Sequence, residues 1–500
     1  MKYIKFLLLL IISIVTVSSC NLELELTNPN ELSPDTFFKN AAQLQSAVNT
    51  VYAPFQTIGM WARHSYFMMD NMSGENAGNP QLEADKRQYM NFSFNPSHGA
   101  IGDYWEQCYR GINKANFVLD NIDIVENVDA TTKARAAGEV KFLRGFYYHL
   151  LLNRYGGVPI YTTLSSEGLP RSSVAEVQNQ IVADLTEAAT TLPDKGSQEL
   201  GRATSGAAYA LLGKVYLFMG NYASANTAFQ NVLSGGYSLT DDYSDNYMEE
   251  TEHNSESIWE ITFSSLYGES SWSDNATGTD ENTYRDIEYG MSWFNVYPSD
   301  ELRAAYEAGD SRYADSFYSN GDVVDPSGEN QVIGVDFPAI PLTRVAAWKK
   351  YQLYYKQTTS TDVSGINFRV IRYADVLLMM AEIENEVGTS AAAIGYLNEV
   401  RNRLSVSMPN YGTAAMNATY PVGTKAEIFD AIVHERMVEL AGEQIRWDDM
   451  LRWGIAASVT AASTQGGAGF TAGKNELFPI PQKEIDSNPS ISQTDQNPGY

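Results

Sequence analysis

The sequence predicts an all-α protein, built from helical hairpins of the tetratricopeptide type, with a large irregular insert that is rich in loops. Three observations predict this class. Apolar residues recur at three- and four-residue steps through much of the chain, one hairpin pattern occurs twice, and the composition changes between residues 241 and 364. The 500 residues are 44% hydrophobic, which is enough for one large core. We therefore expect residues 37–500 to form one compact unit.

Residues 1–19 have the pattern of a secretory signal peptide. Two lysines precede an apolar run from Phe6 to Val17, and the segment ends in Val-Ser-Ser-Cys at Cys20. The run is shorter than the roughly 20 residues of a membrane-spanning helix. Its end resembles a bacterial lipobox, which implies cleavage before Cys20, acylation of that cysteine, and a tether over residues 20–36. The alternative is an ordinary signal peptide beside a chance cysteine.

Residues 37–240 are predicted to form an N-terminal helical region. The clearest support is a hairpin in which large and small residues alternate at tetratricopeptide spacing, so that paired helices approach closely. The same spacing returns about 170 residues later, with glutamate in place of one large aromatic residue. The two sets are Tyr209, Leu212, Gly213, Tyr216, Gly220, Ala225 and Phe229, and Leu377, Met380, Ala381, Glu384, Gly388, Ala393 and Leu397.

Residues 241–364 are predicted to be an irregular, ligand-binding insert, and residues 365–500 a C-terminal helical region that packs on the hairpin scaffold. The insert is rich in Ser, Asp, Asn, Gly, Tyr and Trp and has no sustained period. A stretch of that length without regular structure is usually functional or disordered, and its aromatic residues argue against disorder.

Several classes of chemistry are poorly supported. The chain has no CxxC, HExxH, P-loop or GxSxG motif, and its five histidines are scattered singly. The formal charge of -27 opposes nucleic-acid binding. The segment SDNATGTDENTYRDIEYG, residues 273–290, is rich in oxygen ligands but does not fit EF-hand spacing. Calcium is possible there; otherwise we predict no metal and no cofactor.

The charged stretch HERMVELAGEQIRWDDMLRWG, residues 434–454, raises the question of an active site. An apolar stripe leads into it, so we interpret it as a packed helix whose acids pair with nearby bases. The expected pairs are Arg436 with Glu439, Glu443 with Arg446, and Arg452 with both Asp448 and Asp449. A glycosidase would need two carboxylates that flank a cleft in different environments. We therefore predict a structural framework, no catalytic residue and no enzyme.

Five segments, in order, resemble the SusD/RagB family of surface nutrient-binding lipoproteins. They are EVKFLRGFYYHLLLNRYGGVPIY, GRATSGAAYALLGKVYLFMGNY, FRVIRYADVLLMMAEIENEVG, HERMVELAGEQIRWDDMLRWG and LFPIPQKEIDSNPSISQTDQNPGY. One departure is Gln444, where the family commonly has glycine. The resemblance implies four tetratricopeptide-like helix pairs, a lipid anchor at Cys20 in the outer membrane, and a position facing the cell exterior. It also implies capture of glycans without cleavage and their delivery to a SusC-like TonB-dependent transporter, as in polysaccharide utilisation.

In the family, ligand groups come mainly from the loop after the first helix and from the insert, which here are Trp61 to Pro96 and Tyr267 to Tyr297. Sugars bind through an aromatic plate and planar polar groups, and both loops contain them. For each such aromatic residue, the alternative is a half-buried ring without a ligand. The candidate ligand-binding residues are Trp272, Trp293, Tyr289, Tyr284, Asn76, Asp85, Arg87, Tyr89 and Trp61.

Three other functions stay open at this point. A RagB-like protein for oligopeptide uptake would need partners for backbone amides and a basic group for a carboxylate. A plain tetratricopeptide scaffold would bind another protein on its helical faces and not through the insert. A glycosidase would need an acid pair that we do not find in the sequence.

Overall fold

The computed structural model describes residues 38–266, 281–324, 331–336, 339–340, 344–357, 361, 363–463 and 467–500. The predicted signal peptide and tether lie outside these residues, and so do Cys20 and Trp272. None of the helices in the described part of the chain combines the length and the apolar character needed to cross a membrane.

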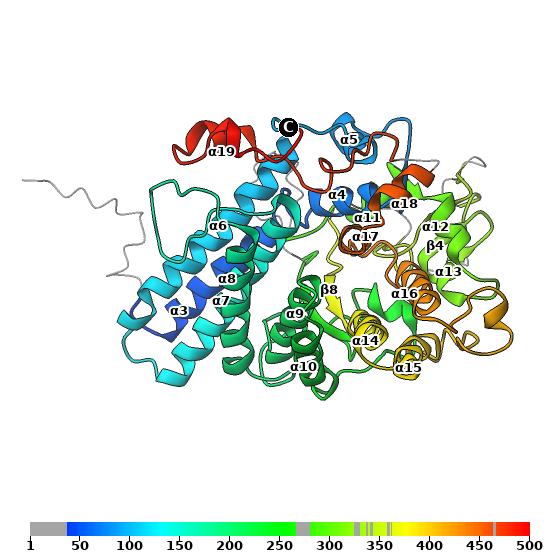
Figure 1. Ribbon diagram of the computed structural model, residues 1–500, viewed down its shortest axis with the longest axis horizontal. Helices are drawn as coiled ribbons and strands as arrows, with labels where there is room; N and C mark the ends of the chain where they lie inside the picture. Colours follow the sequence, from blue (N-terminus) through cyan, green and yellow to red (C-terminus); the bar gives the residue numbers. More distant parts are fainter. Residues whose placement is uncertain are drawn as a thin grey trace, which may run out of the picture.

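The N-terminal half is a row of helices, shown in blue, cyan and green in Figure 1. Consecutive helices from α6 to α10 pack against one another, and α3 packs against both α6 and α7. The elements are α3 (Ala41–Tyr52), η1 (Ala53–Gln56), α4 (His64–Met72), α5 (Ala84–Asn91), α6 (Gly99–Asn121), η2 (Ile122–Ile124), α7 (Ala130–Tyr155), α8 (Val174–Thr191), α9 (Ser205–Phe218) and α10 (Tyr222–Leu233). This helical row confirms the predicted all-α class.

The first predicted hairpin is α9 and α10, and its small residues have the expected role. A Cβ atom on Gly213 would lie 2.5 Å from a ring carbon of Phe229, so only glycine lets the two helices approach this closely. Gly220 forms the turn between them at φ +71. The Asn221 side chain then accepts the Ser224 backbone N–H and caps α10. The spacing seen in the sequence is therefore the spacing of a close-packed helix pair.

Residues 241–364 contain short elements joined by loops. The described elements here are η3 (Tyr243–Asn246), β2 (Ser257–Ile261), α11 (Arg285–Tyr289), β3 (Val296–Pro298), α12 (Asp300–Ala305), α13 (Ser311–Ser316), β4 (Phe317–Ser319), β5 (Val323–Val324), β6 (Gln331–Val332) and β7 (Ala346–Trp348). The strands pair antiparallel as β1–β3, β2–β8, β4–β7 and β5–β6, where β1 is Asn76–Gly78 and β8 is Phe368–Arg372. Two of these pairs thus join the insert to segments before and after it.

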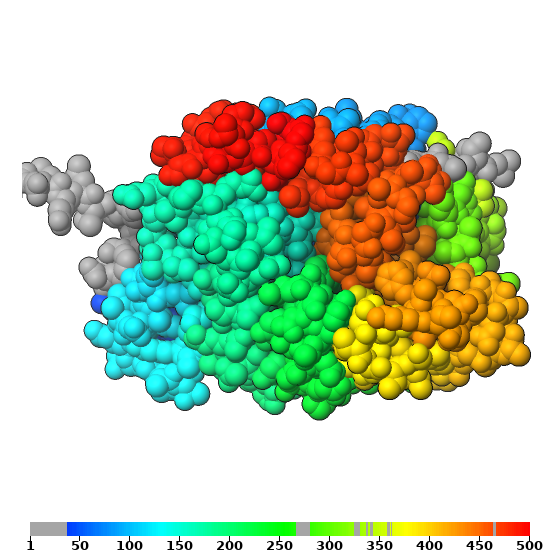
Figure 2. All heavy atoms as spheres, viewed as in Figure 1, coloured from blue at the N-terminus to red at the C-terminus, as the bar shows by residue number. Residues whose placement is uncertain are grey.

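The remaining helices return to the scaffold. They are α14 (Tyr373–Val387), α15 (Ser390–Arg401), η4 (Met416–Ala418), α16 (Lys425–Glu439), α17 (Arg446–Arg452), α18 (Ala456–Ala462), α19 (Gln482–Ser487) and η5 (Gln493–Asp495). Helices α14 and α15 form the second predicted hairpin, which packs beside α10. Figure 2 shows the C-terminal residues, in red, lying across the N-terminal half. Asn488 Nδ2 holds them there by donating to the Leu169 carbonyl at 3.0 Å.

The charged stretch 434–454 is not one helix, which corrects our interpretation. Helix α16 ends at Glu439 and α17 begins at Arg446. Between them, Gly442 has φ +69 and Gln444 has φ +63. This left-handed backbone conformation is costly for residues other than glycine. The departure noted at Gln444 therefore falls in the turn, where the strain is greatest.

Four of the five acids of this stretch are buried among arginines, the exception being the partly buried Asp448, and most partners are distant and not local. Glu439 accepts from Arg372 at 2.7 Å, from Arg403 at 2.8 Å and from Arg312 at 2.9 Å. Burial alone would raise the pKa of Glu439, and these three guanidinium groups hold it well below its usual range. Glu443 lies 2.7 Å from Arg372.

Only one of the expected local pairs forms as predicted. Asp449 lies 2.8 Å from Arg452, whereas Asp448 pairs with Arg154 on α7. Arg436 pairs with Asp449 at 2.7 Å and with Asp375 at 2.8 Å instead of with Glu439. These ion pairs are consistent with a structural framework, but most of the expected local pairs do not form, because residues from distant segments are the partners instead.

Candidate functional site

The two loops expected to carry the site lie side by side. Strand β1 follows α4 in the first loop, and β3 follows α11 in the insert. They pair antiparallel, with Asn76 opposite Pro298 and Gly78 opposite Val296. Segments more than 200 residues apart in the sequence therefore form one surface, which we call the β1–β3 surface, comprising residues 76–87 and 288–298.

Trp293 is the exposed aromatic residue of this surface, with 42% of its area accessible. The backbone beside it is held in place by Asn79. The Asn79 side chain donates to the Phe294 carbonyl at 3.0 Å, and the Asn79 backbone N–H donates to the Asn295 carbonyl at 2.9 Å. Phe294 itself is buried with φ +50. The indole therefore lies on a loop whose backbone is held by two hydrogen bonds from Asn79. An aromatic platform for a sugar needs such a fixed position.

Arg87 shapes the loop next to Trp293. Its Nη2 atom lies 2.8 Å from the carbonyl of Asn79, 3.1 Å from that of Pro80 and 3.3 Å from that of Leu82. Because the guanidinium is engaged with the backbone, we expect it to position the loop. Asp85 differs, since its side chain is 42% exposed and lies 3.8 Å from Lys86 Nζ.

The other described candidates are buried. Tyr284 and Tyr289 have no accessible surface, Asn76 and Tyr89 have 1%, and Trp61 has 6%. A ring enclosed on both faces offers no plate to a sugar. Composition did not indicate that Tyr89 lies on helix α5 and Tyr289 on helix α11, or that these aromatic side chains belong to the buried core.

Two of the buried candidates in the β1–β3 segments contact each other directly. Asn76 Nδ2 donates to the Tyr289 hydroxyl at 2.9 Å, and that hydroxyl donates to Asp70 at 2.9 Å. Trp348 Nε1 donates to Asn76 Oδ1 at 2.8 Å. Burial raises the pKa of Asp70 and of the nearby Glu75. Burial therefore favours the neutral form of each carboxyl group over two negative charges side by side. The network is a floor for the site.

Tyr89 and Trp61 belong to other parts of the core. The Tyr89 ring packs against Phe94 and Phe478, with centroids 6.1 Å away in both cases. Trp61 stacks on Phe146 at 5.9 Å. Both are structural anchors of the segments that enter and leave the first loop.

Arg63, which no sequence pattern singled out, links the two loops through ion pairs. It lies 2.5 Å from Glu288 of the insert and 3.0 Å from Glu83 of the first loop. Burial opposes the charge on Arg63, but these two carboxylates raise its pKa above the usual range. No local pattern marks such a pair, because its members are 225 residues apart in the sequence.

The calcium segment lies partly outside the described residues. Of its described acids, Asp286 accepts the Leu353 backbone N–H at 2.8 Å and the Thr361 backbone N–H at 2.6 Å. Glu288 pairs with Arg63. Both carboxylates are therefore engaged with the protein, and a calcium site on the rest of the segment stays a prediction.

Another arrangement of the described residues brings possible metal ligands together. Donor atoms of Glu252, His253 and Glu260 lie within 4.8 Å of one another. Arg369 already lies 3.3 Å from Glu260, and Asn367 Nδ2 donates to the same carboxylate at 2.8 Å. The positive guanidinium disfavours a second cation at that position.

Comparisons with known proteins agree with this architecture. The SusD family model matches residues 343–500, and the model for starch-binding proteins associating with the outer membrane matches residues 24–217. SusD-like protein P2 of Formosa agariphila is 26% identical, over 99% of this chain and 100% of its own length. A laminarin-binding SusD-like protein of known structure is 28% identical, with a TM-score of 0.77 over 93% of this chain and 100% of that one.

A third similar structure is surface glycan-binding protein A of Bacteroides thetaiotaomicron in complex with laminarihexaose. It has a TM-score of 0.73 and covers 91% of this chain and 99% of that one. At 22% identity it supports the fold alone. Two matching family models at opposite ends of the chain, a relative that aligns over its whole length, and a shared fold lead to the same conclusion: the chain belongs to the SusD/RagB family.

Proposed function

We propose that this protein binds glycans without cleaving them, and that the β1–β3 surface is the binding site. The observation that carries the proposal is Trp293, an exposed indole on a loop that Asn79 holds from below. Asp85 adds an exposed carboxylate that accepts hydrogen bonds from sugar hydroxyls. The 28% identical structure is described as laminarin binding, which supports a glycan over the alternative, an oligopeptide.

The buried carboxyl groups favour binding over hydrolysis. Asp70 and Glu75 have accessible fractions of 0% and 1%, so a glycosidic bond does not reach them. A glycosidase needs two carboxyl groups on either side of the bond that is cleaved. The exposed Asp85 and the engaged Glu83 both come from the first loop and do not form such a pair across a cleft.

We place the protein on the outer membrane, anchored by lipid at Cys20 and facing the cell exterior. There it captures oligosaccharides and delivers them to a SusC-like TonB-dependent transporter. One family model is described as associating with the outer membrane, which supports the location. Membership of the SusD/RagB family supports the transporter as the partner in this proposal.

Calorimetry with laminarihexaose, a panel of other glycans and a panel of oligopeptides tests the binding function. We expect Trp293→Ala to weaken glycan binding roughly thirtyfold, because a central aromatic contact contributes about 2 kcal/mol. Trp293→Tyr should keep part of the affinity. Leu404→Ala is the control, since Leu404 is 70% exposed and lies outside the β1–β3 surface.

The melting temperature of Trp293→Ala should change little, because exposed side chains make few core contacts. Undiminished affinity without Trp293 would place the glycan elsewhere. Binding of peptides alone would replace the proposal with the peptide function. Release of shorter sugars, measured by chromatography, would show that the protein is an enzyme after all.

A further inference from the structure

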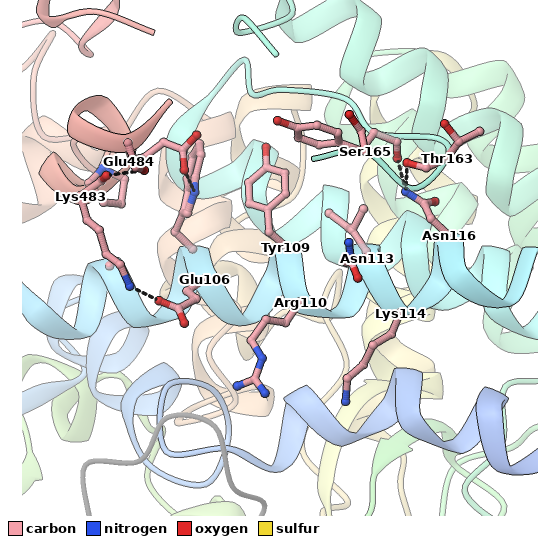
Figure 3. Close-up of a pocket in the computed structure, with 16 residues that line it drawn as sticks. Glu106, Tyr109, Arg110, Asn113, Lys114, Asn116, Thr163, Ser165, Lys483 and Glu484 are labelled. Carbon is pink, nitrogen blue, oxygen red and sulfur yellow. Dashed lines mark hydrogen bonds and ion pairs between the residues drawn. The ribbon is translucent and has the colours of Figure 1, made fainter. Parts of the chain in front are cut away.

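A groove of about 530 Å³ lies over α6, between the loop that follows α7 and the C-terminal helix α19 (Figure 3). Its volume is in the range of small-molecule sites. None of the described residues that line it belongs to the β1–β3 surface. The proposed function therefore leaves this groove unused.

Two segments each present one periodic face to the groove. The lining residues of α6 include a row spaced four residues apart, so they lie on one side of the helix. On the loop, every second residue lines the groove, as in an extended chain. The residues are Trp105, Tyr109 and Asn113 on α6, and Tyr161, Thr163 and Ser165 on the loop.

Two tyrosines give the groove its aromatic surface. Tyr109 on α6 and Tyr161 on the loop have ring centroids 5.9 Å apart at an interplanar angle of 88°, and both rings are only partly buried. Their hydroxyls fix the rings: Tyr109 donates to the Pro159 carbonyl at 2.8 Å, and Tyr161 accepts the Leu169 backbone N–H at 3.0 Å. The aromatic surface is therefore formed before any ligand arrives, which lowers the entropic cost of binding.

Both walls of the groove are attached to the helical scaffold. Asn116 Nδ2 on α6 donates to the carbonyls of Tyr161 at 3.0 Å and Thr163 at 3.2 Å, which fixes the loop. On the other side, Lys483 of α19 lies 2.7 Å from Glu106 of α6. These contacts hold the two walls at a set separation over α6.

The rim of the groove carries polar groups beside the rings. The Asn113 amide and the Thr163 hydroxyl are exposed, and neither has a hydrogen-bond partner in the part of the chain that the structure describes. The Glu484 carboxylate accepts from Trp105 Nε1 at 3.3 Å and from Asn488 Nδ2 at 2.8 Å, one bond to each oxygen. Each carboxylate oxygen accepts about two hydrogen bonds, so Glu484 has further accepting capacity.

The charges beside the rings favour a neutral ligand. Lys483 is paired with Glu106, and Arg110 and Lys114 extend from the side of α6 opposite Tyr109 (Figure 3). The Glu484 carboxylate repels an anion, whereas it strengthens hydrogen bonds from neutral hydroxyls. Aromatic faces next to hydroxyl, amide and carboxylate groups match a pyranose ring, which has an apolar C–H face and hydroxyls around its edge.

We propose that this groove is a second carbohydrate subsite, which takes a neutral oligosaccharide. A sugar ring packs against the tyrosine pair, donates from its hydroxyls to Glu484, and exchanges hydrogen bonds with Asn113 and Thr163. The inference rests on the proposed glycan-binding function and adds a second location on the same chain.

Calorimetry with laminarihexaose and maltohexaose tests the subsite by stoichiometry. We expect at least one hexaose to fill two sites on the wild-type protein, and Trp293→Ala to leave the site in the groove. Adding Asn113→Ala and Thr163→Val to Trp293→Ala should weaken this remaining site about tenfold, because two hydrogen bonds to the sugar are lost. The matched control adds Asn417→Ala and Thr186→Val to Trp293→Ala, at exposed positions outside the groove, and should change nothing.

The substituted groove residues are exposed, so the melting temperature should stay the same in every variant. A single site for both hexaoses, lost with Trp293→Ala and insensitive to Asn113 and Thr163, refutes the subsite and leaves the β1–β3 surface in place. Binding that survives Trp293→Ala and is weakened through Asn113 and Thr163 supports the subsite, even if the β1–β3 surface fails. If neither hexaose binds the wild-type protein, the subsite is refuted, and the panel of other glycans then decides the proposed function.

Discussion

Replacing Glu439 by glutamine should destabilise the protein strongly without abolishing ligand binding. The Glu439 side chain is fully buried and accepts from Arg372, Arg403 and Arg312 at 2.7–2.9 Å. Glutamine keeps the shape but removes the negative charge, so three guanidinium groups lose a shared partner. Breaking a buried ion pair on one side costs roughly 3–5 kcal/mol.

That cost converts into a modest shift in melting temperature for a chain of this size. An unfolding entropy of about 2 cal/mol/K per residue gives roughly 1 kcal/mol/K, so we expect the Tm to fall by about 3–5 °C. Differential scanning calorimetry at pH 7 measures the shift. The control is Glu187→Gln, because Glu187 pairs with Lys141 at the surface and such pairs contribute at most about 1 kcal/mol.

The pH dependence gives a second measurement of the same network. The folded state holds the pKa of Glu439 below its usual range, so its stabilising effect is complete above the unfolded value of about 4.5. The effect is lost as the pH falls through the folded value. The gap between wild type and Glu439→Gln should therefore close in acid. A variant that melts like the wild type but no longer binds glycans would refute this reasoning and make residues 434–454 a functional site.

Two further predictions concern the anchor and a buried acid. Cys20→Ala should release the protein from membranes in a fractionation experiment, and full retention in the membrane would argue against lipidation. Burial raises the pKa of Glu252 to about 8, so wild-type stability should fall as the pH rises from about 4.5 to 8. Glu252→Gln should flatten that slope in melting curves, because an amide oxygen still accepts the Asn367 backbone N–H; an unchanged slope would show that Glu252 ionises normally.

The helical part of the fold could be predicted from the sequence because its signals are local. Gly213 and Phe229 occupy fixed positions in a repeat, and the same close contact appears in the structure. Helix starts follow equally short patterns, such as Ser173 and Glu176, which form a capping box at the start of α8. These features depend on residues only a few positions apart.

The candidate site could be predicted only in part, because exposure there depends on distant segments. Tyr289 and Trp293 lie four positions apart in the same polar segment, yet one is fully buried and the other 42% exposed. The difference arises from the pairing of β1 with β3, which places Asn76 against the Tyr289 hydroxyl. Periodicity carries no information about such a pairing when the strands are three residues long.

The charged stretch 434–454 and the β1–β3 surface are connected by direct contacts through Arg285 and Trp348. Arg285 at the start of α11 donates to the Gly442 carbonyl at 2.6 Å, in the turn that follows Glu439. A Cβ atom on Gly442 would lie 2.9 Å from the ring of Trp348, and Trp348 holds Asn76 under the surface. The acids therefore need no catalytic role to explain their presence. They fix the turn against which Trp348 packs, and Trp348 supports the proposed β1–β3 surface through Asn76. A rigid surface loses less entropy on binding a ligand than a mobile one.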